Sequence, residues 1–519
     1  MAETATAPAV NPLRGQSRGE RVPEPCNMVI FGASGDLTHR KLLPALYNME
    51  LGHLLPPEFC VIGFARRPKT HQEFRDEMKA AINEFSRQKP VREEVWREFE
   101  QRMFYVSSTF EDPKGYQTLL DLMRKNDQEK GTRGNRLYYL STPPSEHGAI
   151  VQQLRELEHP QTDGYKRGWS RIIVEKPFGH DLKSAQELNA LLHGVFDEDQ
   201  IFRIDHYLGK ETVQNILVFR FANGIFEPIW NRDHVDHVQI TVAESVGLEG
   251  RAGYYEQAGT IRDMVANHML QILALTAMEP PSAFDATSVR DEKVKVLRAI
   301  HPWQHREENR EFTVRGQYGP GWVGGQQLPG YREEPGVNPE STTDTYVAMK
   351  LYLDNWRWAG VPFYLRTGKA LPKRVTEVAV TFKRAPFSMF RQTTTTALEP
   401  NVLAMRIQPD EGIVLKFGAK VPGPDIAIRS VNMDFLYGAS FDVAVADAYE
   451  RLILDCMMGE AQLFTREDEV QAQWALIDSI IESWQHQPPP KFPNYAAGTW
   501  GPEQANRFIE RDGRSWRKL

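Results

Sequence analysis

The densest polar cluster in the chain is the run over residues 203–211, which reads RIDHYLGKE. His206, Tyr207 and Lys210 offer hydrogen-bond donors within a short stretch of chain, and such a set suits an anionic group on a ligand. In the plainer interpretation, Asp205 is the N-cap of a helix and the rest of the run is its solvated first turn. We therefore predict an anion site here, with an ordinary helix start as the alternative.

A second candidate is His268, which lies within an apolar stripe of helical spacing over residues 260–278. A lone histidine in such a stripe is usually a core residue. A partly buried imidazole held by a carboxylate is nevertheless what a general base near neutral pH requires. Asp205 or Asp263 could supply that carboxylate, and sequence spacing does not choose between them.

A glycine-rich turn, GASGDL, follows the apolar run at residues 27–31. Without side chains at Gly32 and Gly35, a diphosphate can approach the backbone amides at the start of a helix. The spacing departs from G-x-G-x-x-G, so an ordinary strand-to-helix turn is the alternative. The position after the first strand favours the binding of a dinucleotide.

Two basic positions follow later strands. The second predicted strand ends in Arg66 and Arg67 without an acid, and an arginine there accommodates the 2′-phosphate of NADP. NADP is therefore favoured over NAD, although two surface arginines on an ordinary turn would give the same sequence pattern. Lys176, in the run EKPFG, follows another strand, at the sheet edge where open α/β sheets bind ligands. A lysine before proline is also common in plain turns.

Two kinds of scaffold must position these residues. Apolar runs at 27–31, 59–64, 104–106, 137–140 and 171–175 alternate with helical stretches such as 70–87 and 116–125, which predicts a parallel sheet with helices on both faces. Beyond about residue 205, helices at 211–221 and 260–278 mix with alternating strands at 238–242, 345–353, 377–382 and 403–407. That mixture predicts an α+β domain with a mainly antiparallel sheet.

The predicted fold class is thus α/β followed by α+β. We expect a disordered N-terminal arm over residues 1–26, a Rossmann-like, doubly wound NADP-binding domain over 27–204, and a larger α+β domain for substrate binding and oligomerisation over 205–519.

Composition narrows the function. The 519 residues are 41% hydrophobic and 25% charged, which excludes a disordered chain. There is no apolar run of ~18 residues for a membrane span, and the net charge of −7 disfavours nucleic acid. The three cysteines form no CxxC, which fits a reducing, cytoplasmic location and excludes a thiolate zinc site. No metal-ligand spacing, GxSxG turn or Walker loop occurs, so we predict no metal.

Taken together, the motifs resemble those of the glucose-6-phosphate dehydrogenase family, and they appear in family order from residue 28 to about 485. The segments that carry the resemblance are residues 32–37, 175–179, 203–211, 221–223, 228–232, 261–263, 366–369 and 447–454.

The resemblance implies oxidation of the C1 hydroxyl of D-glucose 6-phosphate to 6-phosphogluconolactone with NADP+ taking the hydride, the first oxidative step of the pentose phosphate pathway. It makes His268 the general base, Asp205 its orienting carboxylate, and His206, Tyr207 and Lys210 the phosphate grip. The other implied sites are the sugar-binding positions Glu244, Asp263, Lys369 and Arg374, the position between sugar and nicotinamide at Lys176, and the cofactor contacts Gly32, Ser34, Gly35, Asp36, Leu37, Arg66 and Tyr139.

The resemblance also bears on assembly. Members of the family are usually dimers or tetramers, so we expect a homodimer or homotetramer. Animal members bind a second, structural NADP through basic residues near the C-terminus. Trp500 stands here where that pattern has an arginine, which argues against a second NADP site.

Two other functions compete with this one. The first is another NADP-dependent sugar oxidoreductase with a similar two-domain layout. The second is a non-catalytic protein that senses the NADP/NADPH ratio, which would have no need of Asp205, His268 and Lys176 together.

Overall fold

The computed structural model describes residues 22–158, 168–301, 311–387, 390, 398–424, 426–441 and 446–519. Contacts divide the chain into two compact units. Unit 1 runs to Ile173 and includes Ile453–Glu460, and unit 2 comprises Val174–Leu452 and Ala461–Leu519. Our predicted boundary at 204/205 falls later in the chain than this division.

Most of the predicted N-terminal arm, residues 1–21, lies outside the described residues. Its last part is held in place, because Pro23, Pro25 and Cys26 are buried and the Pro25 carbonyl accepts a hydrogen bond from Asn135. The packed chain therefore begins before residue 27.

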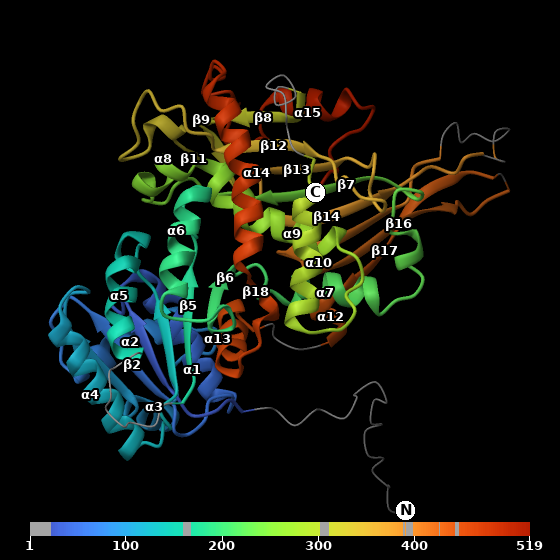
Figure 1. Cartoon of the computed structure of the whole chain (residues 1–519). Coiled ribbons are helices and arrows are strands. Elements are labelled where there is room, and N and C mark those ends of the chain that lie inside the picture. Colours follow the sequence, from blue (N-terminus) through green and yellow to red (C-terminus); the bar gives the residue numbers. More distant parts are fainter. Residues whose placement is uncertain are drawn as a thin grey trace, which may run out of the picture. The chain divides into compact units, whose positions relative to one another are not determined.

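Unit 1 is built on a parallel sheet (Figure 1). Its strands lie in the order β3-β2-β1-β4, and β5 lies beside β4. Every residue of β1, β2 and β4 is buried, as expected for a parallel sheet covered on both faces. The strands are β1 (Asn27–Phe31), β2 (Cys60–Ala65), β3 (Met103–Ser107), β4 (Arg136–Leu140) and β5 (Ser170–Glu175), and the helices are α1 (Leu43–Leu51), α2 (His71–Phe85), α3 (Glu93–Glu100), α4 (Pro113–Glu129) and α5 (His147–Glu158).

Unit 2 contains an eight-stranded sheet in the order β17-β16-β15-β14-β7-β13-β12-β8. Among the described residues, all neighbouring strands of this sheet are antiparallel except β7 and β13. The prediction of a mainly antiparallel sheet is thus confirmed. The strands are β7 (Val235–Ala243), β8 (Thr313–Gly316), β12 (Tyr346–Leu351), β13 (Phe363–Gly368), β14 (Val375–Phe382), β15 (Val402–Gln408), β16 (Gly412–Lys420) and β17 (Ile428–Leu436).

Helices of unit 2 pack beside this sheet, and the long helix α14 contacts α6 and α10 (Figure 1). A short antiparallel pair, β6 (Ile201–Ile204) with β18 (Phe464–Thr465), leads into α14. None of the helices in the described parts of the chain is both long and apolar enough to cross a membrane. The helices are α6 (Leu182–His193), α7 (Glu211–Phe221), α8 (Ala252–Thr260), α9 (Leu270–Ala277), α10 (Ala286–Arg298), α12 (Tyr437–Phe441), α14 (Glu467–Gln485) and α15 (Glu503–Glu510), and α13 (Ala448–Met458) runs from unit 2 into unit 1.

The single helix predicted over residues 260–278 was wrong in its form. The chain there consists of α8, a π-helical segment at Ile261–Met269, and then α9. Gly259, near the end of α8, has a φ of 58°, a conformation that favours glycine, and it kinks the chain just before the π-helical segment. This segment carries both Asp263 and His268.

Candidate functional site

His268 and Asp205 form a buried hydrogen-bonded pair. His268 Nδ1 lies 2.5 Å from Asp205 Oδ1, and the two side chains are 1% and 2% exposed. Asp205 directly follows β6, so a strand end and a π-helical segment meet at this contact. Of the two carboxylates that the sequence left open, Asp205 is the one that binds the imidazole.

The charges of this pair follow from its surroundings. Burial favours the neutral acid at Asp205, but the adjacent His268 outweighs it and holds the pKa of the carboxyl below its usual range. Burial lowers the pKa of His268, with Asp205 acting in the opposite direction. The favoured state is therefore a neutral imidazole whose Nδ1–H donates to a carboxylate, which leaves the lone pair on Nε2.

Lys176 lies at that free nitrogen. Its Nζ is 2.8 Å from His268 Nε2, and it donates to the Asp263 side chain and carbonyl, each at 3.3 Å. Tyr254 also donates to Asp263, at 3.2 Å. Although burial raises the pKa of Asp263, the Lys176 and Lys369 cations lower it more, so this group is a carboxylate. A hydroxyl that reaches Nε2 would meet an imidazole lone pair, an ammonium and a carboxylate.

A second cluster gathers positive charge. Lys210 Nζ donates to Gln408 Oε1 at 2.5 Å, and Arg374 Nη2 donates to the same oxygen at 3.5 Å. Burial, and next the Arg374 cation, lower the pKa of Lys210 to about 8. Two cations therefore converge on one neutral amide, and an anion placed between them would relieve their repulsion. Gln408 is the last residue of β15 and lies far from Lys210 in the sequence, so no sequence motif around Lys210 pointed to it.

His206 and Tyr207 connect the two clusters. The Tyr207 ring stacks on the His268 ring with centroids 4.3 Å apart, and the His206 ring approaches the His268 ring edge-on with centroids 4.7 Å apart. Lys210 Nζ lies 4.0 Å from the centroid of the Tyr207 ring. Burial raises the pKa of Tyr207 to about 12 and lowers that of His206, so both rings are neutral at pH 7.

Glu244 and Lys369 form a third group. They follow β7 and β13, which are neighbouring parallel strands, and their side chains are 2.8 Å apart. Lys369 Nζ also lies 5.0 Å from the centroid of the Tyr255 ring. A carboxylate and an ammonium at adjacent strand ends can accept from and donate to the hydroxyls of a sugar.

The predicted nucleotide turn lies in unit 1. Gly32 has a φ of 83°, and a Cβ there would lie 2.3 Å from the Ser141 carbonyl oxygen, so the turn requires glycine. Gly35 N donates to Gly32 O, and the chain passes through Ser34, Asp36 and Leu37 into a π-helical turn and α1. The first amides of a helix have no partner within it, so this turn fits the diphosphate of a dinucleotide.

Arg66 follows β2 and is exposed, with its guanidinium 6.0 Å from the centroid of the Phe110 ring. Within the described parts of the chain, neither Arg66 nor Arg67 forms an ion pair with a carboxylate. A guanidinium without a carboxylate partner, at the end of the strand next to β1, fits a 2′-phosphate.

The position of Tyr139 differs from that of the other cofactor candidates. Its side chain in β4 is fully buried and presents no exposed surface to a ligand. Ser141 and Thr142 directly follow β4 and lie against Gly32. Sequence reasoning missed Ser141 and Thr142. Their position directly after the strand next to β1 could have pointed to them.

Asp205, His206 and His268 also have atoms within 4.8 Å of one another, a spacing that a metal ion could use. Both nitrogens of His268 already have partners, since Asp205 binds Nδ1 and the Lys176 ammonium lies at Nε2. That ammonium would repel a cation, so we assign no metal.

Family models match both parts of the chain. Residues 29–215 match the glucose-6-phosphate dehydrogenase NAD binding domain, and residues 217–517 match the C-terminal domain of the same family. The chain belongs to the glucose-6-phosphate dehydrogenase family. Its predicted resemblance and its two-part fold class are thereby confirmed.

Several similar proteins match nearly the whole chain. A glucose-6-phosphate 1-dehydrogenase of Chlamydia muridarum is 49% identical over 95% of this chain and 97% of its own length. Glucose-6-phosphate 1-dehydrogenase 2 of Mycobacterium tuberculosis is 48% identical, with 98% of each chain covered. A solved glucose-6-phosphate dehydrogenase in complex with glucose-6-phosphate is 36% identical with a TM-score of 0.86, covering 96% of this chain and 99% of that one.

Proposed function

We propose that this member of the glucose-6-phosphate dehydrogenase family oxidises D-glucose 6-phosphate at C1 to 6-phospho-D-glucono-1,5-lactone, with NADP+ as hydride acceptor. One observation carries the proposal. Within unit 2, a neutral imidazole that is hydrogen-bonded to a carboxylate is connected to a cluster of cations. The first arrangement can remove a proton and the second can hold a phosphate. Tyr207 contacts both, because it stacks on His268 and lies under Lys210.

The proton step belongs to His268. Removing the C1 hydroxyl proton as the hydride departs avoids a full positive charge on carbon. His268 Nε2 accepts that proton, and Asp205 stabilises the imidazolium through Nδ1. Lys176 gives up its contact with Nε2 to the hydroxyl and keeps its contacts with Asp263.

Orientation comes from the phosphate. Lys210 and Arg374 would bind it in place of Gln408, with His206 and Tyr207 as neutral donors. Binding energy from this remote group then holds C1 beside His268, with Glu244 and Lys369 on the sugar hydroxyls. NADP+ supplies the hydride acceptor, and the turn at Gly32, Ser34, Gly35, Asp36 and Leu37 would hold it together with Arg66, while a contact from Tyr139 stays a prediction.

A substrate survey tests the proposal. The purified chain is mixed with NADP+ and, in separate assays, glucose 6-phosphate, fructose 6-phosphate, 6-phosphogluconate and free glucose. We expect NADPH absorbance to rise fastest by far with glucose 6-phosphate. Faster reduction with another sugar would favour the alternative sugar oxidoreductase, and NADP+ binding without reduction of NADP+ by any sugar would favour a sensor.

Assembly as a homodimer or homotetramer is part of the proposal. The edge strand β17 supports it, because Val431, Met433 and Leu436 are 39%, 62% and 40% exposed. Such an apolar edge suits a second copy of the chain.

Two further predictions stand with it. The absence of a second NADP site is supported by Arg366, whose guanidinium lies 5.0 and 4.6 Å from the ring centroids of Trp500 and Trp516. A cytoplasmic location is supported by the three cysteines, which are all free and buried.

A further inference from the structure

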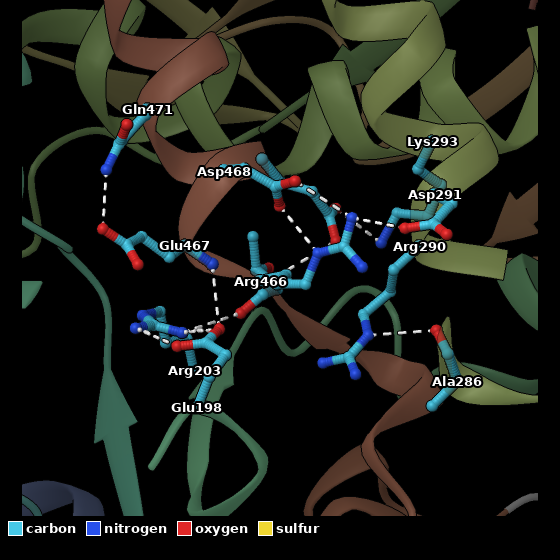
Figure 2. Close-up of polar contacts among 12 residues, drawn as sticks. Glu198, Arg203, Ala286, Arg290, Asp291, Lys293, Arg466, Glu467, Asp468 and Gln471 are labelled. Carbon is cyan, nitrogen blue, oxygen red and sulfur yellow. Dashed lines mark hydrogen bonds and ion pairs between the residues drawn. The ribbon is translucent and has the colours of Figure 1, made fainter. Parts of the chain in front are cut away.

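The first turn of α14 contacts the strand that leads to Asp205. Before this turn, β18 pairs with β6, so that Thr465 lies opposite Arg203, two residues before Asp205. Arg203 donates to both carboxylate oxygens of Glu198, at 2.7 and 3.0 Å. The backbone N–H of Glu467, the first residue of α14, donates to the same carboxylate at 3.0 Å (Figure 2).

The same turn also contacts the helix that continues from His268. Glu469 Oε2 accepts a hydrogen bond from Gln271 at 3.1 Å and pairs with Lys293 at 2.8 Å. Gln271 lies three residues after His268, at the start of α9, and all three side chains of this contact are at most 1% exposed. In addition, α14 packs directly against the π-helical segment.

The turn is itself anchored from outside. Arg466 forms ion pairs with Asp468 at 2.8 Å and with Asp291 of α10 at 2.6 Å (Figure 2). Arg466 N also donates to Glu469 Oε1 at 3.2 Å. One oxygen of Glu469 therefore closes the helix start, and the other holds Gln271.

Stability alone explains this arrangement poorly. The electrostatic attraction within a fully buried ion pair such as Lys293–Glu469 seldom exceeds the free-energy cost of desolvating its two charges. In addition, π-helical segments are rare and often lie at functional sites. We propose that the first turn of α14 positions the Asp205–His268 pair, with Glu469 acting on His268 through Gln271 and Glu198 acting on Asp205 through Arg203. This inference rests on the proposed function.

The contact between Glu469 and Gln271 can be tested by a substitution that should disturb the fold little. Gln271 Oε1 is buried without a hydrogen-bond partner, so Gln271→Leu removes the contact with Glu469 together with an unsatisfied acceptor. Gln473→Leu is the matched control, because Gln473 is also buried on α14 with an unpartnered amide nitrogen and, among the described residues, forms no hydrogen bond with Gln271 or His268.

Glu467→Pro tests the other contact. Residue 467 is the first of α14, a position that proline favours, and Arg466 has the extended backbone that proline requires before it. The change removes the N–H that binds Glu198, and Glu467→Ala controls for loss of the side chain.

We expect Gln271→Leu to lower kcat between about fivefold and fiftyfold, with KM for glucose 6-phosphate within about twofold of wild type. We expect a smaller fall in the same direction for Glu467→Pro. Both controls should stay near wild type, and Tm should change little in all four variants.

The pH profile separates positioning from damage to the fold. His268 faces Asp205, His206 and Tyr207 from the end of β6, Lys176 from the end of β5, and Asp263 from its own segment. Asp205 raises the pKa of His268, so a looser contact should move the acid limb of kcat to lower pH in Gln271→Leu.

The outcomes are distinct. Wild-type kcat in folded Gln271→Leu and Glu467→Pro, or losses that only follow a fall in Tm, would overturn the positioning role. If Gln271→Leu fails to fold, Glu467→Pro decides. An inactive wild-type chain would refute the proposed function and the inference together, whereas an active wild type with unaffected variants refutes the inference alone.

Discussion

The nucleotide turn of unit 1 and the polar clusters of unit 2 are built in opposite ways. The turn uses backbone amides and an exposed arginine, and its internal contact joins Gly32 to Gly35. The clusters use side chains that already bind one another across the chain: the buried Asp205 and His268 are 63 residues apart, and the half-buried Lys210 and Gln408 are 198 residues apart. A site for a cofactor can thus come from one local turn, whereas proton transfer and phosphate recognition need the whole fold.

The largest effect should come from the proton-removing pair. His268→Asn removes the base but keeps a small polar side chain, so kcat should fall by roughly 10²- to 10⁴-fold while KM for glucose 6-phosphate changes little. Steady-state kinetics check this, with Asp205→Asn as a companion that should also lose kcat. Near-normal turnover in His268→Asn would make His268 a core histidine and leave unit 2 without its base.

The next effect concerns the phosphate cluster. Lys210→Ala removes a charged hydrogen bond of roughly 2–3 kcal/mol, which corresponds to a rise of about 30- to 150-fold in KM for glucose 6-phosphate. The KM for NADP+ should stay nearly the same, because the turn of unit 1 is unchanged. An equal rise in both KM values would indicate general damage to the fold.

The cofactor turn should show a smaller, selective effect. If Arg66 pairs with the 2′-phosphate, Arg66→Ala should reduce the preference for NADP+ over NAD+ by about tenfold to hundredfold. Measuring kcat/KM with each cofactor gives the ratio. An unchanged ratio would remove Arg66 from the site and make Arg67 the next candidate.

The smallest effect is a pH dependence. Lys210 is charged below its pKa of about 8 and loses its proton above it, so KM for glucose 6-phosphate should rise above that pH, by up to about tenfold per unit. Lys210→Arg keeps its charge and should flatten this rise. The same slope in both proteins would show that Lys210 does not cause it.

Sequence reasoning succeeded for features that depend on a pattern of neighbouring residues. Predicted strands at 27–31 and 137–140 match β1 and β4, and the predicted helix at 211–221 matches α7. The pattern could not show that Gln408 meets Lys210 or that Glu469 meets Gln271, because these contacts join distant elements. It also missed the π-helical segment, because the apolar stripe over residues 260–278 has the spacing of an α-helix.

The most direct test of the division of labour within unit 2 is the ratio of kcat/KM for glucose 6-phosphate to kcat/KM for free glucose, measured in wild type, Lys210→Ala and His268→Asn. The phosphate cluster acts on one substrate only, whereas the base acts on both. We predict that Lys210→Ala lowers this ratio by about 30- to 150-fold through the first substrate alone, and that His268→Asn lowers both rates while leaving the ratio intact. A ratio unchanged in Lys210→Ala, or one that collapses in His268→Asn, would contradict the account.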